Sequence, residues 1–141
     1  MTAFQLAERF RNEITEIPGS THHPFIQWCH MLCDLGPDQP DEVPWCSSFV
    51  NAVCWMLRLP RSKSAAARSW LTVGAGIDLD DAEPDADVVI LKRGINPAAG
   101  HVGFYAGHDV INVQLLGGNQ SNGVTIQNFP RTSIIGVRRL L

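Results

Sequence analysis

The sequence predicts an α+β fold in which helices come first and an antiparallel sheet follows. Over residues 3–57 apolar side chains recur every three or four positions, as one buried helix face requires. From residue 87 onward, short apolar or alternating stretches are separated by glycine-rich or Asn-Gly turns, which is typical of antiparallel strands. We therefore expect N-terminal helices packed on an antiparallel sheet of about five strands.

The helical half divides at its Gly-Pro and Pro-Gly pairs. A first helix is predicted over residues 3–16 and a second over residues 24–35, because a Pro/Gly pair follows each. Residues 36–44 hold three prolines and three acidic residues and are predicted to be a loop. This loop leads directly into a third helix that begins at Cys46, so we expect it to form one wall of a cleft. A short helix is predicted over residues 65–71.

The second half reads as a series of strands, predicted over residues 87–92, 101–106, 110–115, 124–127 and 133–140. A hairpin across Gly107-His108-Asp109 would pair the second strand with the third. The polar turn over residues 117–123 would then return to the end of the sheet at which the second strand begins. Glycines in this turn separate it from the next strand.

Cys46 begins the apolar stripe of the third helix, directly after a proline and a tryptophan. At the first turn of a helix, unpaired backbone N–H groups and the helix dipole lower the pKa of a thiol. The same N–H groups can stabilise an oxyanion. The alternative is that Cys46 is a small buried hydrophobe, because free cysteine is among the most buried residue types.

A nucleophilic cysteine needs a base, and the base needs a third group that orients it. His101 is the candidate base, because it starts a strand in which Val102, Phe104 and Ala106 alternate with other residues. The polar turn supplies either Asn119 or Gln120 as the third group, and the spacing leaves both open.

Three segments in this order resemble the CHAP and NlpC-like cysteine amidases and peptidases, which are papain-like enzymes that cut peptidoglycan. The segments are Trp45-Cys46-Ser47-Ser48-Phe49-Val50, Gly100-His101-Val102-Gly103-Phe104 and Gly117-Gly118-Asn119-Gln120. The resemblance covers about residues 40–141 and is to the small phage-endolysin type of these enzymes. It implies a single catalytic domain over residues 1–141, with N-terminal helices in 1–36 and a papain-like core in 45–141.

The resemblance further implies that Cys46 is the nucleophile, His101 the base and Asn119 the residue that orients the imidazole. Many relatives carry an acidic residue, or a polar residue at a slightly different offset, in the third position, so Gln120 stays an alternative. Trp45, Trp70 and Tyr105, with Gln120, are candidates for substrate binding, although core packing suits the tryptophans at least as well.

The predicted function is that of an endolysin-like peptidoglycan hydrolase without a cofactor, either an N-acetylmuramoyl-L-alanine amidase or a peptidoglycan endopeptidase. One alternative is an injected antibacterial amidase effector, and another is a non-catalytic cell-wall-binding protein of the same fold. Glycan cleavage ranks last, because it needs two carboxylates that flank the bond, and the acidic residues here cluster in loops.

Composition narrows the possible partners and location. A chain of 141 residues with 45% hydrophobic content fits one domain, and a net charge of −3 argues against nucleic-acid binding. No apolar run has the length of a membrane span, and residues 1–17 are too charged for a signal peptide. We expect a monomer without stable membrane association, made in the cytoplasm and brought to peptidoglycan in the periplasm by a holin pore or by injection.

Two groups of residues suggest metals, but each has a simpler interpretation. Cys29 and Cys33 lie four residues apart near His22, His23 and His30. Core packing is favoured there, because the usual zinc spacings are absent. The acidic loop over residues 78–87 lacks the glycine turn and terminal glutamate of a calcium-binding hand, so we expect a solvated surface.

Overall fold

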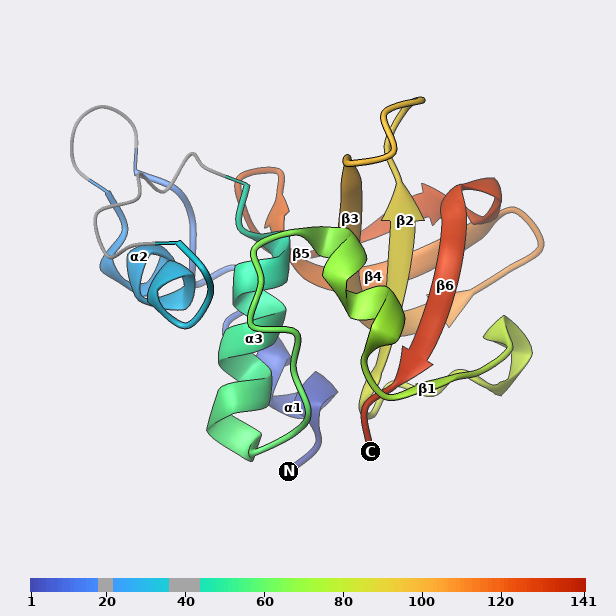
Figure 1. Cartoon of the computed structure of the whole chain (residues 1–141), viewed down its shortest axis with the longest axis horizontal. Helices are drawn as coiled ribbons and strands as arrows, with labels where there is room; N and C mark the ends of the chain where they lie inside the picture. The colour runs from blue at the N-terminus through green and yellow to red at the C-terminus, as the bar shows by residue number, and fades with distance from the viewer. Residues whose placement is uncertain (18–21, 36–43) are drawn as a thin grey trace.

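The computed structural model describes residues 1–17, 22–35 and 44–141. These residues form an α+β fold with one open, antiparallel six-stranded sheet. The helices α1 (Ala3–Glu8), α2 (Pro24–Met31) and α3 (Cys46–Leu57) all lie to one side of the sheet (Figure 1). The α+β class and the antiparallel sheet expected from the sequence are confirmed.

Neighbouring strands in the sheet are antiparallel throughout, in the order β1-β6-β2-β3-β4-β5. The strands are β1 (Ala75–Gly76), β2 (Asp87–Lys92), β3 (Gly100–His108), β4 (Asn112–Gln120), β5 (Gly123–Pro130) and β6 (Ile134–Arg139). The expected hairpin between the second and third predicted strands is the β3–β4 pair. The strand that was not expected is β1, which has two residues and is too short to leave a pattern in the sequence.

The N-terminal helix is shorter than predicted. It ends at Glu8, after which Asn12 adopts a left-handed backbone with φ 64°, and Thr15 forms a bridge to Gly123 at the edge of the sheet. The apolar residues therefore continue with helical spacing while the backbone does not continue as a helix. The predicted second helix likewise ends early, at Met31.

The remaining short elements are 3₁₀ helices. The predicted helix over residues 65–71 is the 3₁₀ helix η1 (Ala67–Thr72), and η2 (Leu79–Asp81) and η3 (Arg131–Ser133) are shorter still. The loop predicted over residues 36–44 lies outside the described residues except for Pro44.

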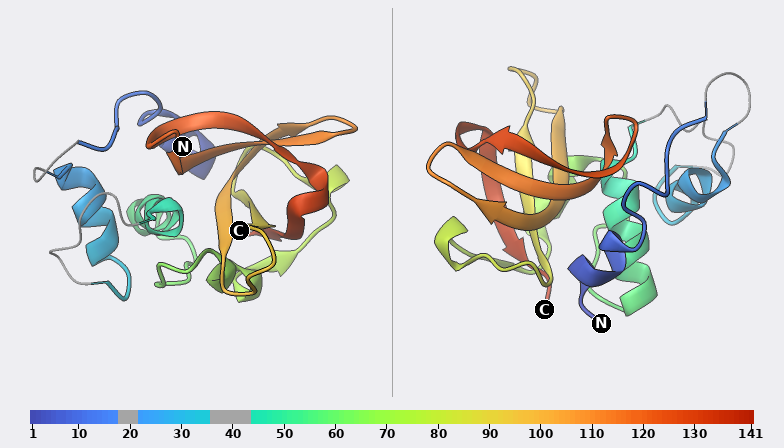
Figure 2. Two further views of the ribbon diagram at one scale, coloured as in Figure 1. Left: turned by 90° about the horizontal axis from the view of Figure 1, so that it is seen from above. Right: turned by 180° about the vertical axis from the view of Figure 1, so that it is seen from behind.

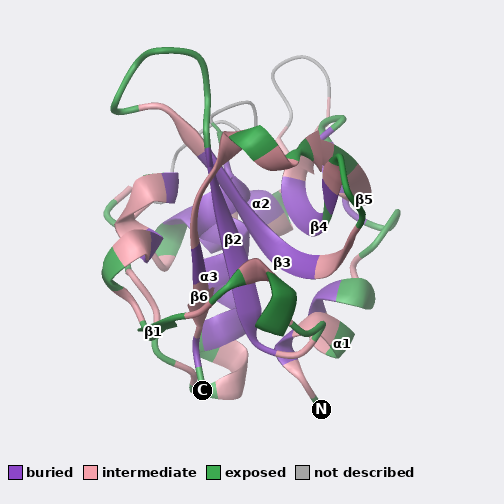
Figure 3. Cartoon of the chain, turned by 90° about the vertical axis from the view of Figure 1, so that its right-hand side faces the viewer, coloured by how far each residue is buried: buried purple, intermediate pink, exposed green. Residues whose placement is uncertain are grey.

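Helix α3 is the centre of the main core. It packs against β3 and β4 on one side and against α2 on the other, as the view from above shows (Figure 2). It also contacts α1, which itself packs against β3 and β4. Every residue from Cys46 to Cys54 is buried, which makes this helix purple along most of its length in Figure 3. Phe49, Val50 and Val53 are fully buried, and each such side chain contributes roughly 1.5–3 kcal/mol to folding.

A second apolar cluster occupies the other face of the curved sheet. It consists of buried side chains from four strands: Val89, Leu91, Tyr105, Val113, Leu115 and Val137. Alternate residues of β2 and β3 therefore lie in different clusters. Val88 and Val102, for example, belong to the main cluster on the side of α3. The sheet is buried on both faces along its central strands.

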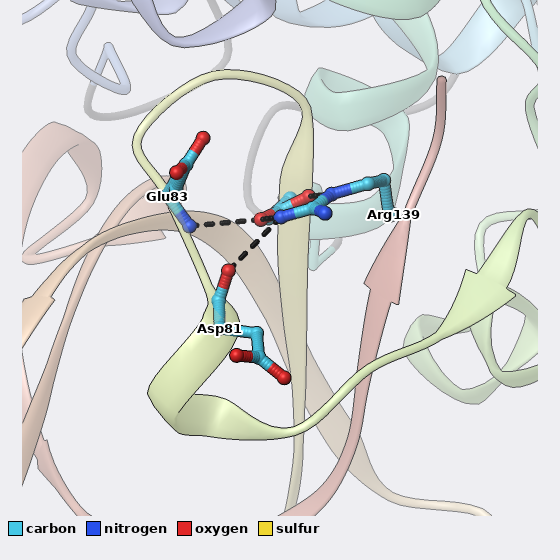
Figure 4. A network of polar contacts seen from close by, with 4 residues as sticks. Asp81, Glu83 and Arg139 are labelled. Carbon is cyan, nitrogen blue, oxygen red and sulfur yellow. Dashed lines mark hydrogen bonds and ion pairs between the residues drawn. The ribbon is translucent and has the colours of Figure 1, made fainter.

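A paired carboxylate and guanidinium tie the acidic loop to the end of the sheet (Figure 4). Arg139 donates from Nε and Nη2 to the two carboxylate oxygens of the buried Asp87, at 2.9 and 2.8 Å. The backbone N–H of Glu83 donates to Asp87 at 2.8 Å, and Arg139 donates to the carbonyl of Asp81 at 3.0 Å. The last carboxylate of the loop is thus a structural acceptor and not a solvated group, since two-pronged Arg–carboxylate pairing fixes geometry.

Gly118 on β4 provides the first test of how closely the sheet and α3 fit. A methyl group at this position would lie 2.6 Å from the Trp45 ring and 2.8 Å from Phe49 Cβ. We expect Gly118→Ala to lower the free energy of unfolding by about 1–3 kcal/mol, because the Trp45 ring and the first turn of α3 must shift. Urea unfolding measures this loss. Gly76→Ala is the control, because its methyl group would meet only the flexible end of Arg138, and equal stabilities of the two variants would contradict the prediction.

Candidate active site

The first residue of α3 is Cys46, and the residue before it fixes the start of the helix. Trp45 is fully buried, donates from its indole N–H to Glu16 at 2.8 Å, and packs beside Gly118. Cys46 itself is 5% exposed. Backbone N–H groups of Val102, Ser47 and Cys46 point toward its sulfur. The cysteine therefore lies between the helix start and strand β3.

Burial raises the pKa of the Cys46 thiol, and this effect outweighs those that act against it. The N–H groups of Val102, Ser47 and Cys46 lower the pKa, as does the nearby positive charge of Arg93. The N–H groups therefore act on the pKa in the direction expected from the sequence. The net shift is opposite to the one expected, because the sulfur is enclosed and the thiolate would lose its hydration.

His101 lies near the start of β3 with only 1% of its surface exposed. Its Nε2 is 2.9 Å from Oε1 of Gln120. The Gln120 amide nitrogen donates to the carbonyls of Leu115, at 3.1 Å, and Thr125, at 2.8 Å. Carbonyls only accept hydrogen bonds, so the amide oxygen of Gln120 must be the atom that faces the imidazole. His101 thus carries its proton on Nε2 and has a lone pair on Nδ1.

Arg93 lies at that lone pair, with a guanidinium nitrogen 3.2 Å from His101 Nδ1. Within the described residues, neither ring nitrogen of His101 is hydrogen-bonded to Cys46, because Gln120 and Arg93 take both. The two predicted catalytic residues are connected through Arg93, which contacts His101 Nδ1 and lines the pocket together with Cys46.

Burial also lowers the pKa of His101 to about 4. The hydrogen bond to Gln120 acts in the opposite direction, and the charge of Arg93 lowers the pKa further. The imidazole is accordingly neutral at pH 7, with Nδ1 able to accept a proton.

The amide that contacts His101 belongs to Gln120, the alternative that the sequence left open beside Asn119. Asn119 lies in a bulge of β4 with a left-handed backbone of φ 58°, where the pairing with β5 shifts between Gly117 and Gln120. Gly117 leaves room for the turn, since a methyl group there would lie 2.6 Å from Oε1 of Gln120. The predicted polar turn is therefore mostly strand, and only Ser121 and Asn122 form the hairpin turn.

A pocket of about 240 Å³ opens beside the cysteine. Cys46 and Arg93 line it together with small residues: Pro44, Ala65, Ala66, Ala67, Ala98, Ala99 and Gly100. Sequence reasoning missed Arg93. The available signal was its place directly after the predicted strand 87–92, at the same end of the sheet as His101.

The three aromatic candidates for substrate binding serve as framework. Trp70 is fully buried, and its indole N–H donates to Ser47 Oγ at 2.8 Å, one residue after the cysteine. Trp45 is equally buried, and Tyr105 faces the second core, with its hydroxyl 2.6 Å from His108 Nδ1. Among the described residues that line the pocket, Cys46 is the one that was proposed for this site from the sequence. The packing interpretation of the two tryptophans therefore agrees with their burial.

The other cysteines lie in or beside the helical core. Cys29 and Cys54 are fully buried, and Cys33 is partly buried. Burial raises the pKa of Cys54 to about 12 and raises that of Cys29 as well. His30 pairs through Nδ1 with Ser48 Oγ at 2.8 Å. Across residues 1–17, 22–35 and 44–141, no three His, Cys, Asp or Glu side chains gather as a metal site would require.

No protein-family model matches this sequence, and no curated protein matches it either. In the part of the chain that the structure describes, none of the helices has the length and apolar character needed to traverse a bilayer. Function must therefore be inferred from the geometry around Cys46 and His101.

The lowered pKa of His101 predicts a specific pH dependence of stability. The pKa is about 4 in the folded chain and about 6.5 in the unfolded chain, so the unfolded chain binds the proton first as pH falls. The stabilisation is complete above about pH 6.5 and is lost progressively toward pH 4, by roughly 3 kcal/mol in total. Urea unfolding at pH 7.5, 5.5 and 4.5 measures it. His101→Gln cannot titrate and should lack this component, so identical pH profiles for both proteins would contradict the prediction.

Proposed function

We propose that this chain is a papain-like cysteine hydrolase that cleaves an amide bond in the peptide part of peptidoglycan. The observation that carries the proposal is the orientation of His101, whose Nε2–H is held by Gln120 while the lone pair of Nδ1 is directed at Arg93, a residue that lines the pocket together with Cys46. A base fixed in one tautomer next to a thiol at a helix start is what nucleophilic cysteine catalysis requires.

In the first step, His101 Nδ1 takes the proton of the Cys46 thiol, and the sulfur attacks the amide carbonyl. Backbone N–H groups in the first turn of α3 have no partner within the helix, because the first helical bond is from Phe49 to Trp45. The N–H of Cys46 is thus available to the oxyanion that forms on the carbonyl oxygen.

In the second step, the imidazolium returns its proton to the departing amine, and the carbon–nitrogen bond breaks to leave a thioester on Cys46. Water then attacks the thioester while His101 accepts its proton, which releases the carboxylic acid and the thiol. Gln120 supports both steps by holding the imidazole in place. As a neutral amide, it stabilises the imidazolium less than a carboxylate would.

The substrate class follows from the resemblance to CHAP and NlpC-like enzymes. The chain would act as an N-acetylmuramoyl-L-alanine amidase or a peptidoglycan endopeptidase of the endolysin type, as a monomer without a cofactor. It would reach the wall through a holin pore, or by injection if it is an antibacterial effector.

A second candidate function is non-catalytic binding to the cell wall, and the burial of Cys46 favours it. A raised pKa suits a packing cysteine, and Arg93 occupies the nitrogen that the thiol would need. Alkylation by iodoacetamide at pH 7.5 separates the two candidates. Catalysis requires Cys46 to react faster than Cys54, which is buried on the same helix, whereas equally slow reaction of both favours binding.

Replacement of Cys46 is the direct test of the catalytic function. We expect Cys46→Ala to reduce release of peptide products from purified peptidoglycan by more than about 10³-fold, because no other group forms the thioester. Mass spectrometry of the digested wall identifies new amines and the bond that was cut. Cys54→Ala is the matched control and should retain activity. Equal products from wild type and Cys46→Ala would show that another nucleophile acts.

Gln120 and Asn119 can be separated by a pair of variants. We expect Gln120→Ala to lower kcat by about 10- to 100-fold per folded molecule, because His101 loses the acceptor that fixes its tautomer. Asn119→Gly keeps the left-handed backbone and should leave kcat nearly unchanged. Circular dichroism gives the folded fraction of each variant. A larger loss for Asn119→Gly would make Asn119 the orienting residue.

A further inference from the structure

Arg93 is a cation at the mouth of the candidate site that the mechanism above does not use. It directly follows β2, is exposed, and lines the pocket together with Cys46. The other described lining residues are alanines, a glycine and a proline. Arg93 is therefore the charged side chain among the described residues of this pocket, and its charge acts on the Cys46 thiol.

The partner of Arg93 is a poor match for a guanidinium. Its hydrogen bond to His101 Nδ1 is 3.2 Å long, and within the described residues Arg93 forms no ion pair. Arginine binds planar anions through two parallel hydrogen bonds, and such pairs are about twice as strong as hydrogen bonds between neutral groups. A carboxylate that entered the pocket would thus compete effectively with the imidazole for Arg93.

The same contact bears on catalysis. The Nδ1 lone pair that must accept the thiol proton is the one that Arg93 occupies, while Nε2 is engaged by Gln120. Proton transfer from Cys46 therefore requires Arg93 to turn away from the ring. A ligand that draws the guanidinium away would free the base at the moment when substrate is present.

We propose that Arg93 binds a free carboxylate next to the scissile amide, and that this binding releases His101 Nδ1 to accept the proton of Cys46. The proposal rests on the proposed cysteine hydrolase function and names its substrate class, which is a peptide amide with a neighbouring carboxylate. Arg93 gives up no proton. Its N–H groups exchange the imidazole nitrogen for two carboxylate oxygens, and the thiol proton passes to Nδ1 as before.

The test uses soluble muropeptides from purified wall, either with free carboxylates or with the carboxylates converted to carboxamides. We expect wild type to cleave the free form with a kcat/KM about 10- to 100-fold higher, which is the range for a hydrogen-bonded charge pair. Arg93→Ala should remove this preference by slowing cleavage of the free form alone. Its rate on the carboxamide form should be unchanged or higher, because His101 is no longer blocked.

Lys92→Ala is the matched control, since it removes the same charge from the neighbouring exposed residue and should keep the preference. Arg93→Lys should retain only part of it, because an ammonium lacks the planar fork. A purely structural role for Arg93 would instead slow cleavage of both forms equally, which would overturn the proposal.

Binding to the Cys46→Ala variant gives a readout that does not depend on turnover. Titration calorimetry should show tighter binding of the free form, and this difference should vanish when Arg93→Ala is added. Cleavage of both forms by wild type at equal rates would refute the carboxylate proposal and leave the hydrolase function standing. Neither cleavage nor binding of either form would refute both.

Discussion

The hydrogen bond between His101 Nε2–H and Gln120 Oε1 is the constraint on which the rest of the site depends. The orientation of the Gln120 amide determines this hydrogen bond. The amide nitrogen donates both of its N–H groups to the carbonyls of Leu115 and Thr125, which leaves the oxygen facing His101. A buried donor without an acceptor costs about 1–3 kcal/mol, so the amide cannot reverse without leaving its nitrogen against the imidazole N–H. The β4–β5 hairpin thereby sets the tautomer of a histidine on β3 and leaves the lone pair on Nδ1, where Arg93 lies.

Two glycines and a bulge make this arrangement possible. Gly118 allows β4 to lie against the Trp45 ring at the start of α3, and Gly117 leaves space for the amide of Gln120. Asn119, which lies between Gly118 and Gln120, has a left-handed backbone and accommodates the register shift between β4 and β5. In the segment over residues 117–120, the backbone of the first three residues thus positions the side chain of Gln120. Side-chain chemistry alone would not distinguish Asn119 from Gln120, because both are amides of similar hydrogen-bonding capacity.

This explains how far the sequence could predict the structure. The strands were found because their apolar runs are bounded by turn residues, and α3 because its stripe is continuous. The end of α1 was missed, since Asn12 and the Thr15 bridge interrupt the backbone without interrupting the apolar spacing. Arg93 was missed because an arginine after a strand is ordinary in sequence, and only the β2–β3 pairing brings it to His101. The sign of the Cys46 pKa shift was missed because burial depends on the whole fold.

Burial of both candidate catalytic groups has a consequence for how such a site would work. With the pKa of Cys46 raised and that of His101 lowered, the resting pair is a neutral thiol and a neutral imidazole. An ion pair formed in advance is thus disfavoured, and the charge separation has to be stabilised when substrate arrives. The helix N–H groups already act in that direction at the sulfur, while the guanidinium of Arg93 opposes a positive imidazole. A substrate carboxylate would neutralise Arg93 and so remove its unfavourable effect on the protonated imidazole. A single contact would then both free His101 Nδ1 and favour the protonated form of the ring.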